Sequence, residues 1–128
     1  MKAIALIENV SSLKRPTYLE GRHSFLKAAE NRRAKIVSYP HAARGRHNEE
    51  LATDVSYVGP EEPAKLLVIS TAVHGIEGFA GCAILTQLFG EQLDGLRLPD
   101  DAGVLCINFV SPRGASFATS SAWLHPSL

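Results

Sequence analysis

The sequence predicts an α/β fold: a partial mixed sheet with a parallel strand-helix-strand unit and an antiparallel pair of strands at one edge. Two short apolar runs, 66–70 and 104–107, predict strands that are covered on both faces. The segment between them, 79–89, is apolar on nearly all sides, which predicts a buried helix. Because a strand, a helix and a strand follow in this order, we expect the two strands to be parallel.

A helix that covers the sheet is predicted before the first strand. Thr17 can cap this helix, and Glu20 stands three residues later at the position of a capping-box partner. Apolar residues then recur at helical spacing, with charged residues between them, until Asn31. We therefore expect a helix that ends at Asn31 and lies as a covering layer on the sheet.

The next two segments predict the antiparallel pair. Residues 35–39 form a short strand-like run that we expect to be closed by Pro40. Residues 51–58 alternate in polarity, which predicts a half-buried second strand. The alternating residues on which this prediction depends are Leu51, Thr53, Val55 and Tyr57.

The composition changes after Val110. Residues 111–128 are rich in Ser and Ala and have no clear periodicity. Segments of this kind at a chain end are commonly poorly ordered. We therefore expect residues 1–110 to form the folded part and residues 111–128 to form an irregular tail.

The composition also argues against several classes of partner. The chain has 128 residues, and its 13 basic and 13 acidic residues cancel, which removes the main electrostatic attraction to nucleic acid or to an anionic membrane. No stretch is long enough to cross a bilayer. The two cysteines, Cys82 and Cys106, have neither the number nor the spacing of a disulfide framework. We expect reduced, buried thiols in a cytoplasmic protein with no nucleic-acid or membrane partner.

The residues most indicative of function follow the apolar run 66–70. His74 and Glu77 stand three residues apart on a glycine-rich turn. In open α/β sheets, ligands collect at the carboxyl ends of parallel strands. An imidazole and a carboxylate suit Zn²⁺, and two histidines with one glutamate form a known catalytic ligand set. On these residues alone, the pair is either half of a zinc site or a turn histidine beside an N-terminal helix acid.

The segment 71–81 resembles the signature of a widespread, poorly characterised branch of the zinc carboxypeptidase clan. In that signature a strand ends in Thr-His-Gly-Val-Glu-Gly-Phe, and this chain has Thr-Ala-Val-His-Gly-Ile-Glu-Gly-Phe. Residues 18–29, 50–55 and 57–60 are also similar to the N-terminal portion of that branch. The resemblance therefore covers roughly residues 17–108.

The resemblance implies a zinc-dependent hydrolase of peptide or amide bonds. It makes residues 1–110 the N-terminal part of a zinc carboxypeptidase-like domain, a mixed sheet sandwiched by helices. It assigns His74 and Glu77 as ligands of Zn²⁺. In such a site the metal ion polarises the substrate carbonyl and lowers the pKa of the water bound to the metal. The implied substrate is a small peptide or an acylated amino acid. The resemblance assigns no catalytic or substrate-binding residue in this chain.

The sequence departs from the family pattern after Asn108. The family continues with an Asn-Pro-x-Gly segment and then an Asn-Arg pair that grips the substrate carboxylate. Here residues 109–114 read Phe-Val-Ser-Pro-Arg-Gly, and no Asn-Arg pair follows. The family's third ligand and its late catalytic glutamate have no counterpart, so we expect a truncated domain with a tail read out of frame. Within the chain, His125 would have to replace the third ligand and Arg113 the anion grip, whereas the ordinary interpretations are a histidine of the tail and a solvated surface arginine.

Three functions stay open. The first is a zinc-dependent, carboxypeptidase-like hydrolase. The second is a catalytically inactive, truncated fragment that binds metal weakly or not at all. The third is a small module that holds an anionic metabolite on the basic loop around Arg44 and Arg46. Since an incomplete sheet leaves an unpaired edge, self-association is also expected.

Overall fold

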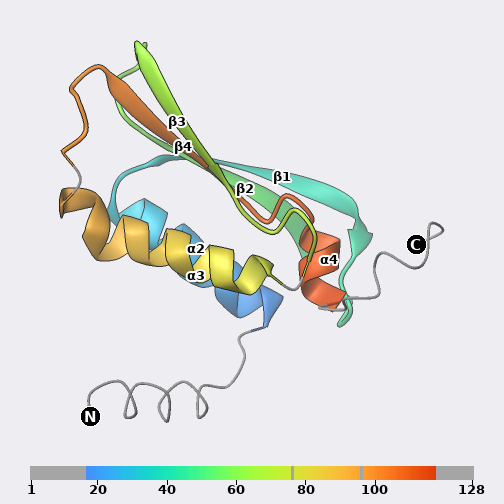
Figure 1. The fold of residues 1–128 in the computed structure, drawn as a ribbon. Coiled ribbons are helices and arrows are strands. Elements are labelled where there is room, and N and C mark those ends of the chain that lie inside the picture. Colours follow the sequence, from blue (N-terminus) through green and yellow to red (C-terminus); the bar gives the residue numbers. More distant parts are fainter. Residues whose placement is uncertain (1–16, 76, 96, 118–128) are drawn as a thin grey trace, which may run out of the picture.

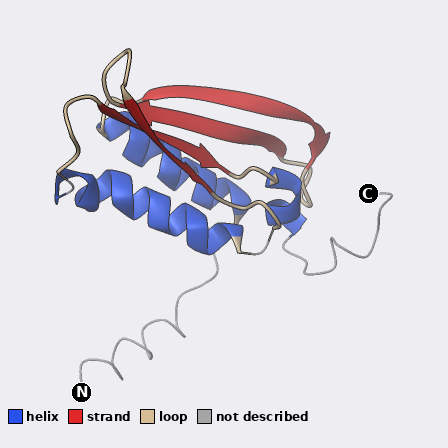
Figure 2. Cartoon of the chain, turned by 45° about the horizontal axis from the view of Figure 1, so that its top comes forward, coloured by secondary structure: helices blue, strands red, loops and turns tan. Residues whose placement is uncertain are grey.

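The computed structural model of the chain describes residues 17–75, 77–95 and 97–117. They form one four-stranded sheet with helices on one of its faces (Figures 1 and 2). The strand order is β1-β2-β4-β3, with β1 at Lys35–Arg44, β2 at Glu50–Val58, β3 at Lys65–Ser70 and β4 at Ala102–Asn108. β2 is antiparallel to both β1 and β4, whereas β3 and β4 are parallel. The predicted α/β class, with its parallel unit and its antiparallel edge pair, is confirmed.

Helices α2 (Tyr18–Asn31) and α3 (Gly78–Gln87) pack side by side under the sheet. α2 begins at the predicted capping box: Thr17 Oγ1 accepts from the Glu20 N–H at 3.2 Å, and Glu20 Oε2 accepts from the Thr17 N–H at 2.7 Å. The helical path of α3 continues through one turn of π-helix (Leu88–Gln92) and one turn of 3₁₀ helix (Leu93–Gly95). Among the described residues, no helix is long and apolar enough to cross a membrane.

The inward face of β2 differs from the expected one. Thr53, Val55 and Tyr57 are only partly buried, whereas Asp54 and Ser56 are fully buried on the side of the helices. The reason is a tertiary contact, because an arginine of α2 pairs with Asp54. The strand itself was predicted correctly, but its alternation did not identify the covered face.

β1 does not close at Pro40 but continues to Arg44. Pro40 lies opposite Ala52 in the antiparallel register. The N–H and C=O of Ala52 both bond to the Tyr18 hydroxyl, each at 2.9 Å, so they point away from β1. Pro40 and Ala52 therefore form a non-hydrogen-bonded pair, and the missing N–H of the proline breaks no bond of the ladder.

β3 and α3 are less buried than predicted. Leu66, Leu67 and Val68 are 51%, 49% and 51% exposed, and Ile84 on α3 is 67% exposed. β3 is an edge strand, and helices cover only one face of the sheet. The apolar runs therefore predicted the strand and the helix correctly. They overestimated how far the other described residues bury the side chains of these two elements.

The irregular tail expected from residue 111 begins with a short helix, α4 (Pro112–Phe117). Pro112, Gly114 and Ala115 of this helix are buried. The prediction was wrong for 112–117 because tertiary packing, which local periodicity does not report, stabilises this helix. Residues 118–128, including His125, lie outside the described residues.

Candidate metal site at the end of β3

His74 and Glu77 lie on the exposed turn between β3 and α3. Glu77 Oε1 accepts a hydrogen bond from the His74 backbone N–H at 2.6 Å, so the carboxylate folds back over the turn that carries the histidine. The backbone N–H of Glu77 itself, followed by the N–H and the charge of His74, lowers the pKa of the Glu77 carboxyl. Glu77 is therefore held as an anion. A carboxylate has about four lone-pair sites, so this hydrogen bond leaves room for a cation.

Two glycines let α3 approach the end of β3 closely. A Cβ on Gly78 would lie 2.3 Å from Ala72 Cβ, and a Cβ on Gly81 would lie 2.8 Å from Thr71 Cβ. Both distances are too short for carbon atoms in contact. Any larger residue would push the helix away from the strand end and would move the turn between them.

Gly75 fixes the other side of the turn against α4. Its φ of +133° lies in a region that favours glycine. A Cβ on Gly75 would lie 3.1 Å from the carbonyl oxygen of Gly114. The His74–Gly75 backbone therefore packs directly on α4, and the predicted tail forms a wall of the candidate site.

The two parallel strands end in the same unusual backbone conformation. Ala72, after β3, has a φ of 57°, and Phe109, after β4, has a φ of 56°. A non-glycine residue in this region costs about 1–2 kcal/mol. Cross-strand bonds hold both turns: the N–H of Val110 donates to Thr71 O at 2.9 Å, and that of Ser111 donates to Ala72 O at 2.8 Å. Such conformations often accompany functional sites.

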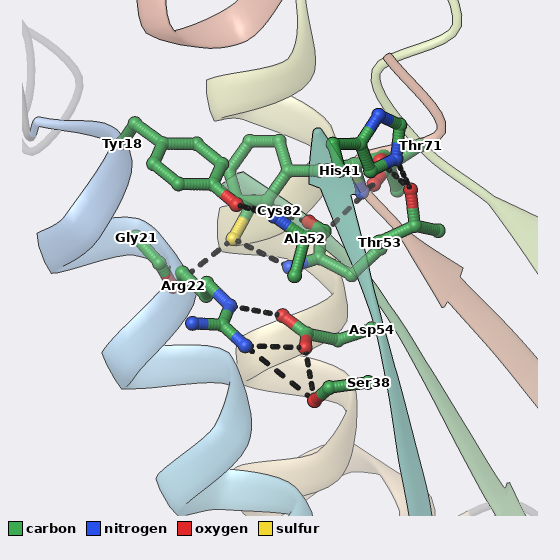
Figure 3. Close-up of polar contacts among 12 residues, drawn as sticks. Tyr18, Gly21, Arg22, Ser38, His41, Ala52, Thr53, Asp54, Thr71 and Cys82 are labelled. Carbon is green, nitrogen blue, oxygen red and sulfur yellow. Dashed lines mark hydrogen bonds and ion pairs between the residues drawn. The ribbon is translucent and has the colours of Figure 1, made fainter. Parts of the chain in front are cut away.

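A buried polar pair lies directly beneath these turns. The Thr71 hydroxyl donates to Asn108 Oδ1 at 3.0 Å and accepts from the Phe109 N–H at 3.3 Å. Asn108 Nδ2 lies 3.5 Å from Cys82 Sγ, and the Cys82 thiol donates to the carbonyl of Gly21 at 3.2 Å (Figure 3). Burial raises the pKa of the Cys82 thiol, which fits a structural cysteine and not a nucleophile.

A second polar cluster, which the sequence reasoning missed, joins α2 to β1 and β2. The Arg22 guanidinium donates to both carboxylate oxygens of Asp54, at 2.8 and 2.9 Å, and the Ser38 hydroxyl donates to Asp54 Oδ1 at 2.6 Å (Figure 3). Asp54 is fully buried. The signal in the sequence that could have revealed this cluster is Asp54, an acidic residue in the middle of a strand-like run.

The metal-ligand set is incomplete within the described ranges. Across residues 17–75, 77–95 and 97–117, no group of three His, Cys, Asp or Glu side chains could hold a metal ion. His74 and Glu77 thus fit Zn²⁺ by donor type but supply only two ligands. His125, the proposed third ligand, is outside those ranges. The assignment of His74 and Glu77 stays a prediction.

The basic loop gives little support to an anion site. Arg44 Nη1 lies 3.4 Å from Glu50 Oε1, so an acid across the hairpin balances its charge. The backbone N–H of Arg46 donates to Ser116 Oγ at 2.9 Å, which ties the loop to α4. Arg113, the suggested anion grip, lies over the Phe117 ring at 5.3 Å from its centroid. These contacts with other parts of the chain indicate structural roles at the surface for the three arginines.

A family profile described as a protein of unknown function, DUF2817, matches residues 15–121. The match runs past Asn108, so it contradicts an out-of-frame tail that starts there. No curated protein matches the chain significantly.

Among solved structures, glutaminyl cyclases are similar to part of the chain. The enzyme from Fimbriiglobus ruber is 18% identical with a TM-score of 0.48, over 70% of this chain and 36% of its own. The enzyme from Tannerella forsythia is 16% identical with a TM-score of 0.48, over 69% and 36%. The chain thus spans about a third of their length, and likeness at this level carries no activity over to it.

Proposed function

This chain belongs to the DUF2817 family, and on that premise we propose that it carries half of the zinc site of a hydrolase acting on peptide or amide bonds. The observation that supports this proposal best is the turn itself. An exposed imidazole and an ionised carboxylate share one turn at the carboxyl end of a parallel strand. This is the edge of an α/β sheet at which ligands commonly bind.

The proposed role of each residue follows from its chemistry. His74 supplies a ring nitrogen and Glu77 a carboxylate oxygen to the ion. Bound Zn²⁺ would supply a Lewis acid for the scissile carbonyl and for the attacking water. Gly75 and Gly78 hold the turn between α4 and the end of β3, so they position both ligands. The buried Thr71–Asn108 bond braces the same strand ends from below.

The proposed site needs at least one more ligand. Two protein ligands leave most of the coordination sphere to water, which lowers affinity and fixes the nucleophile poorly. His125 is the candidate within the sequence, and another polypeptide is the alternative. The proposed substrates are small peptides or acylated amino acids. The competing proposal is an inactive fragment that keeps the turn without its metal.

Calorimetric titration of the purified chain with Zn²⁺ separates these proposals. For a zinc half-site we expect one ion per chain, and we expect His74→Ala to weaken binding about tenfold or more. Glu77→Gln, which removes the charge but keeps the shape, should weaken binding as well. His23→Ala is the matched control, because His23 is an exposed histidine on α2. Equal affinities of the His74 and His23 variants, or no binding at all, would support the inactive fragment.

A further inference from the structure

Thr71, the residue directly after β3, bonds through all of its polar groups to the end of β4. Its backbone N–H donates to Ile107 O at 3.0 Å, and its carbonyl oxygen accepts from the Val110 N–H at 2.9 Å. Its hydroxyl donates to Asn108 Oδ1 and accepts from the Phe109 N–H (Figure 3). Thr71 is buried. One buried residue therefore joins the ends of the two parallel strands.

The hydroxyl of Thr71 supports an unfavourable backbone conformation. Thr71 and Asn108 are each followed by a residue with a positive φ, 57° at Ala72 and 56° at Phe109. Non-glycine residues keep such a conformation only where the surrounding contacts hold it. Phe109 is fully buried, so its N–H needs a hydrogen-bond partner, and the Thr71 hydroxyl supplies one. Loss of the hydroxyl would therefore weaken the support of both turns.

The turn that carries His74 and Glu77 depends on this backbone at both of its ends. It leaves the sheet through Ala72, directly after Thr71. At its other end, α3 packs onto Thr71, because a Cβ on Gly81 would lie 2.8 Å from Thr71 Cβ and 2.9 Å from Thr71 Cγ2. A shift of Thr71 would therefore move both ends of the turn.

We propose that Thr71 is a positioning residue of the zinc half-site: its hydroxyl fixes the backbone of the turn, so that His74 and Glu77 are arranged before the ion binds. This inference rests on the proposed function. A ligand set that is already ordered avoids the entropic cost of ordering it on binding. The bond from the His74 N–H to Glu77 Oε1, at 2.6 Å, belongs to a turn that is ordered in this way.

Three variants separate the hydroxyl of Thr71 from its packing. Thr71→Val keeps the branched shape that α3 packs against but replaces the hydroxyl with a methyl group. Thr71→Ser keeps the hydroxyl and loses the methyl group. Tyr18→Phe is the matched control, because it also removes a buried hydroxyl with two hydrogen bonds, which join Tyr18 to the N–H and the carbonyl of Ala52.

Two measurements on the full chain test the role of Thr71. In calorimetric titration with Zn²⁺, Thr71→Val should bind the ion about tenfold more weakly than the wild type, as is typical when a group that orients a metal ligand is lost. Thr71→Ser and Tyr18→Phe should bind it like the wild type. In hydrogen exchange followed by NMR without zinc, the His74 N–H should exchange faster in Thr71→Val alone, because the turn then opens locally more often.

The outcomes separate this inference from the proposed function. If the wild type binds zinc and Thr71→Val binds it equally well, the inference alone fails. Equal weakening by Thr71→Val and Tyr18→Phe also overturns it, because any lost buried hydroxyl would then have the same effect. A wild type that binds no zinc contradicts the proposed function, and equal exchange of the His74 N–H in wild type and Thr71→Val then overturns the role of the hydroxyl as well. Circular dichroism checks each fold, and Thr71→Ala compared with Thr71→Ser isolates the hydroxyl if Thr71→Val unfolds.

Discussion

The guanidinium of Arg22 on α2 and the carboxylate of Asp54 on β2 form a bidentate salt bridge. Asp54 is fully buried, and the Arg22 side chain is 23% exposed. The pKa of the Arg22 guanidinium is raised, first by this hydrogen bond. The pair therefore ties the covering helix to a central strand of the sheet and determines which face of β2 is covered.

Arg22→Ala should lower the free energy of unfolding by about 3 kcal/mol, because it leaves a buried carboxylate without its partner. Arg44→Ala is the matched control. The Arg44–Glu50 pair is largely exposed, and its loss should cost less than about 1 kcal/mol. Urea denaturation of both variants measures the difference. Equal effects would contradict the structural role of the buried pair.

Gly78→Ala should destabilise the fold by about 1–3 kcal/mol, because its Cβ would overlap that of Ala72. Gly90→Ala is the control, since a Cβ on Gly90 would meet nothing within 4 Å. That control should be neutral or stabilising by up to about 1 kcal/mol. Thermal denaturation compares the two. If Gly78→Ala is as stable as Gly90→Ala, α3 does not approach β3 as closely as described.

Lowering the pH should remove the contribution that the ionised Glu77 carboxylate makes to the stability of the fold. Its folded pKa lies below the ordinary value of 4.5, because the backbone N–H groups of Glu77 and His74 bond to the ionised form. The contribution is present above pH 4.5 and is lost as the pH falls through the lower folded value. Carbon NMR titration of the Glu77 carboxyl measures that value, and Glu77→Gln should flatten this part of the acid stability curve. A pKa at or above 4.5 would contradict the folded-back carboxylate.

Both thiols should react slowly with Ellman's reagent in the native chain. Cys82 and Cys106 are free and buried, and burial raises the pKa of the Cys106 thiol to about 11. Since the thiolate is the reactive form, both should react only after unfolding in urea. Fast reaction of one thiol in the native protein would show that the core near it is open.

Local sequence signals predicted the elements of this fold well. The Thr17–Glu20 capping box marked the start of α2, and the runs at 66–70 and 104–107 marked two parallel strands. These signals are local because capping and continuous apolarity depend on neighbours in the chain.

The features that were missed depend on contacts between distant segments. Asp54 points inward because Arg22 on another element pairs with it, and its own strand does not indicate this. Pro40 lies inside β1 because its register makes the missing N–H harmless. α4 packs through the close approach of Gly75 and Gly114, which are far apart in the sequence. The glycines and His74-x-x-Glu77 pointed to the candidate site, but no local pattern reveals a third ligand.

Diffraction from crystals soaked in Zn²⁺, with data collected at the zinc absorption edge, tests the central claim most directly. We predict one anomalous peak at the turn after β3, about 2.0–2.2 Å from both a ring nitrogen of His74 and a carboxylate oxygen of Glu77. A peak bound by only one of these side chains, or no peak at the turn, contradicts a shared metal ion.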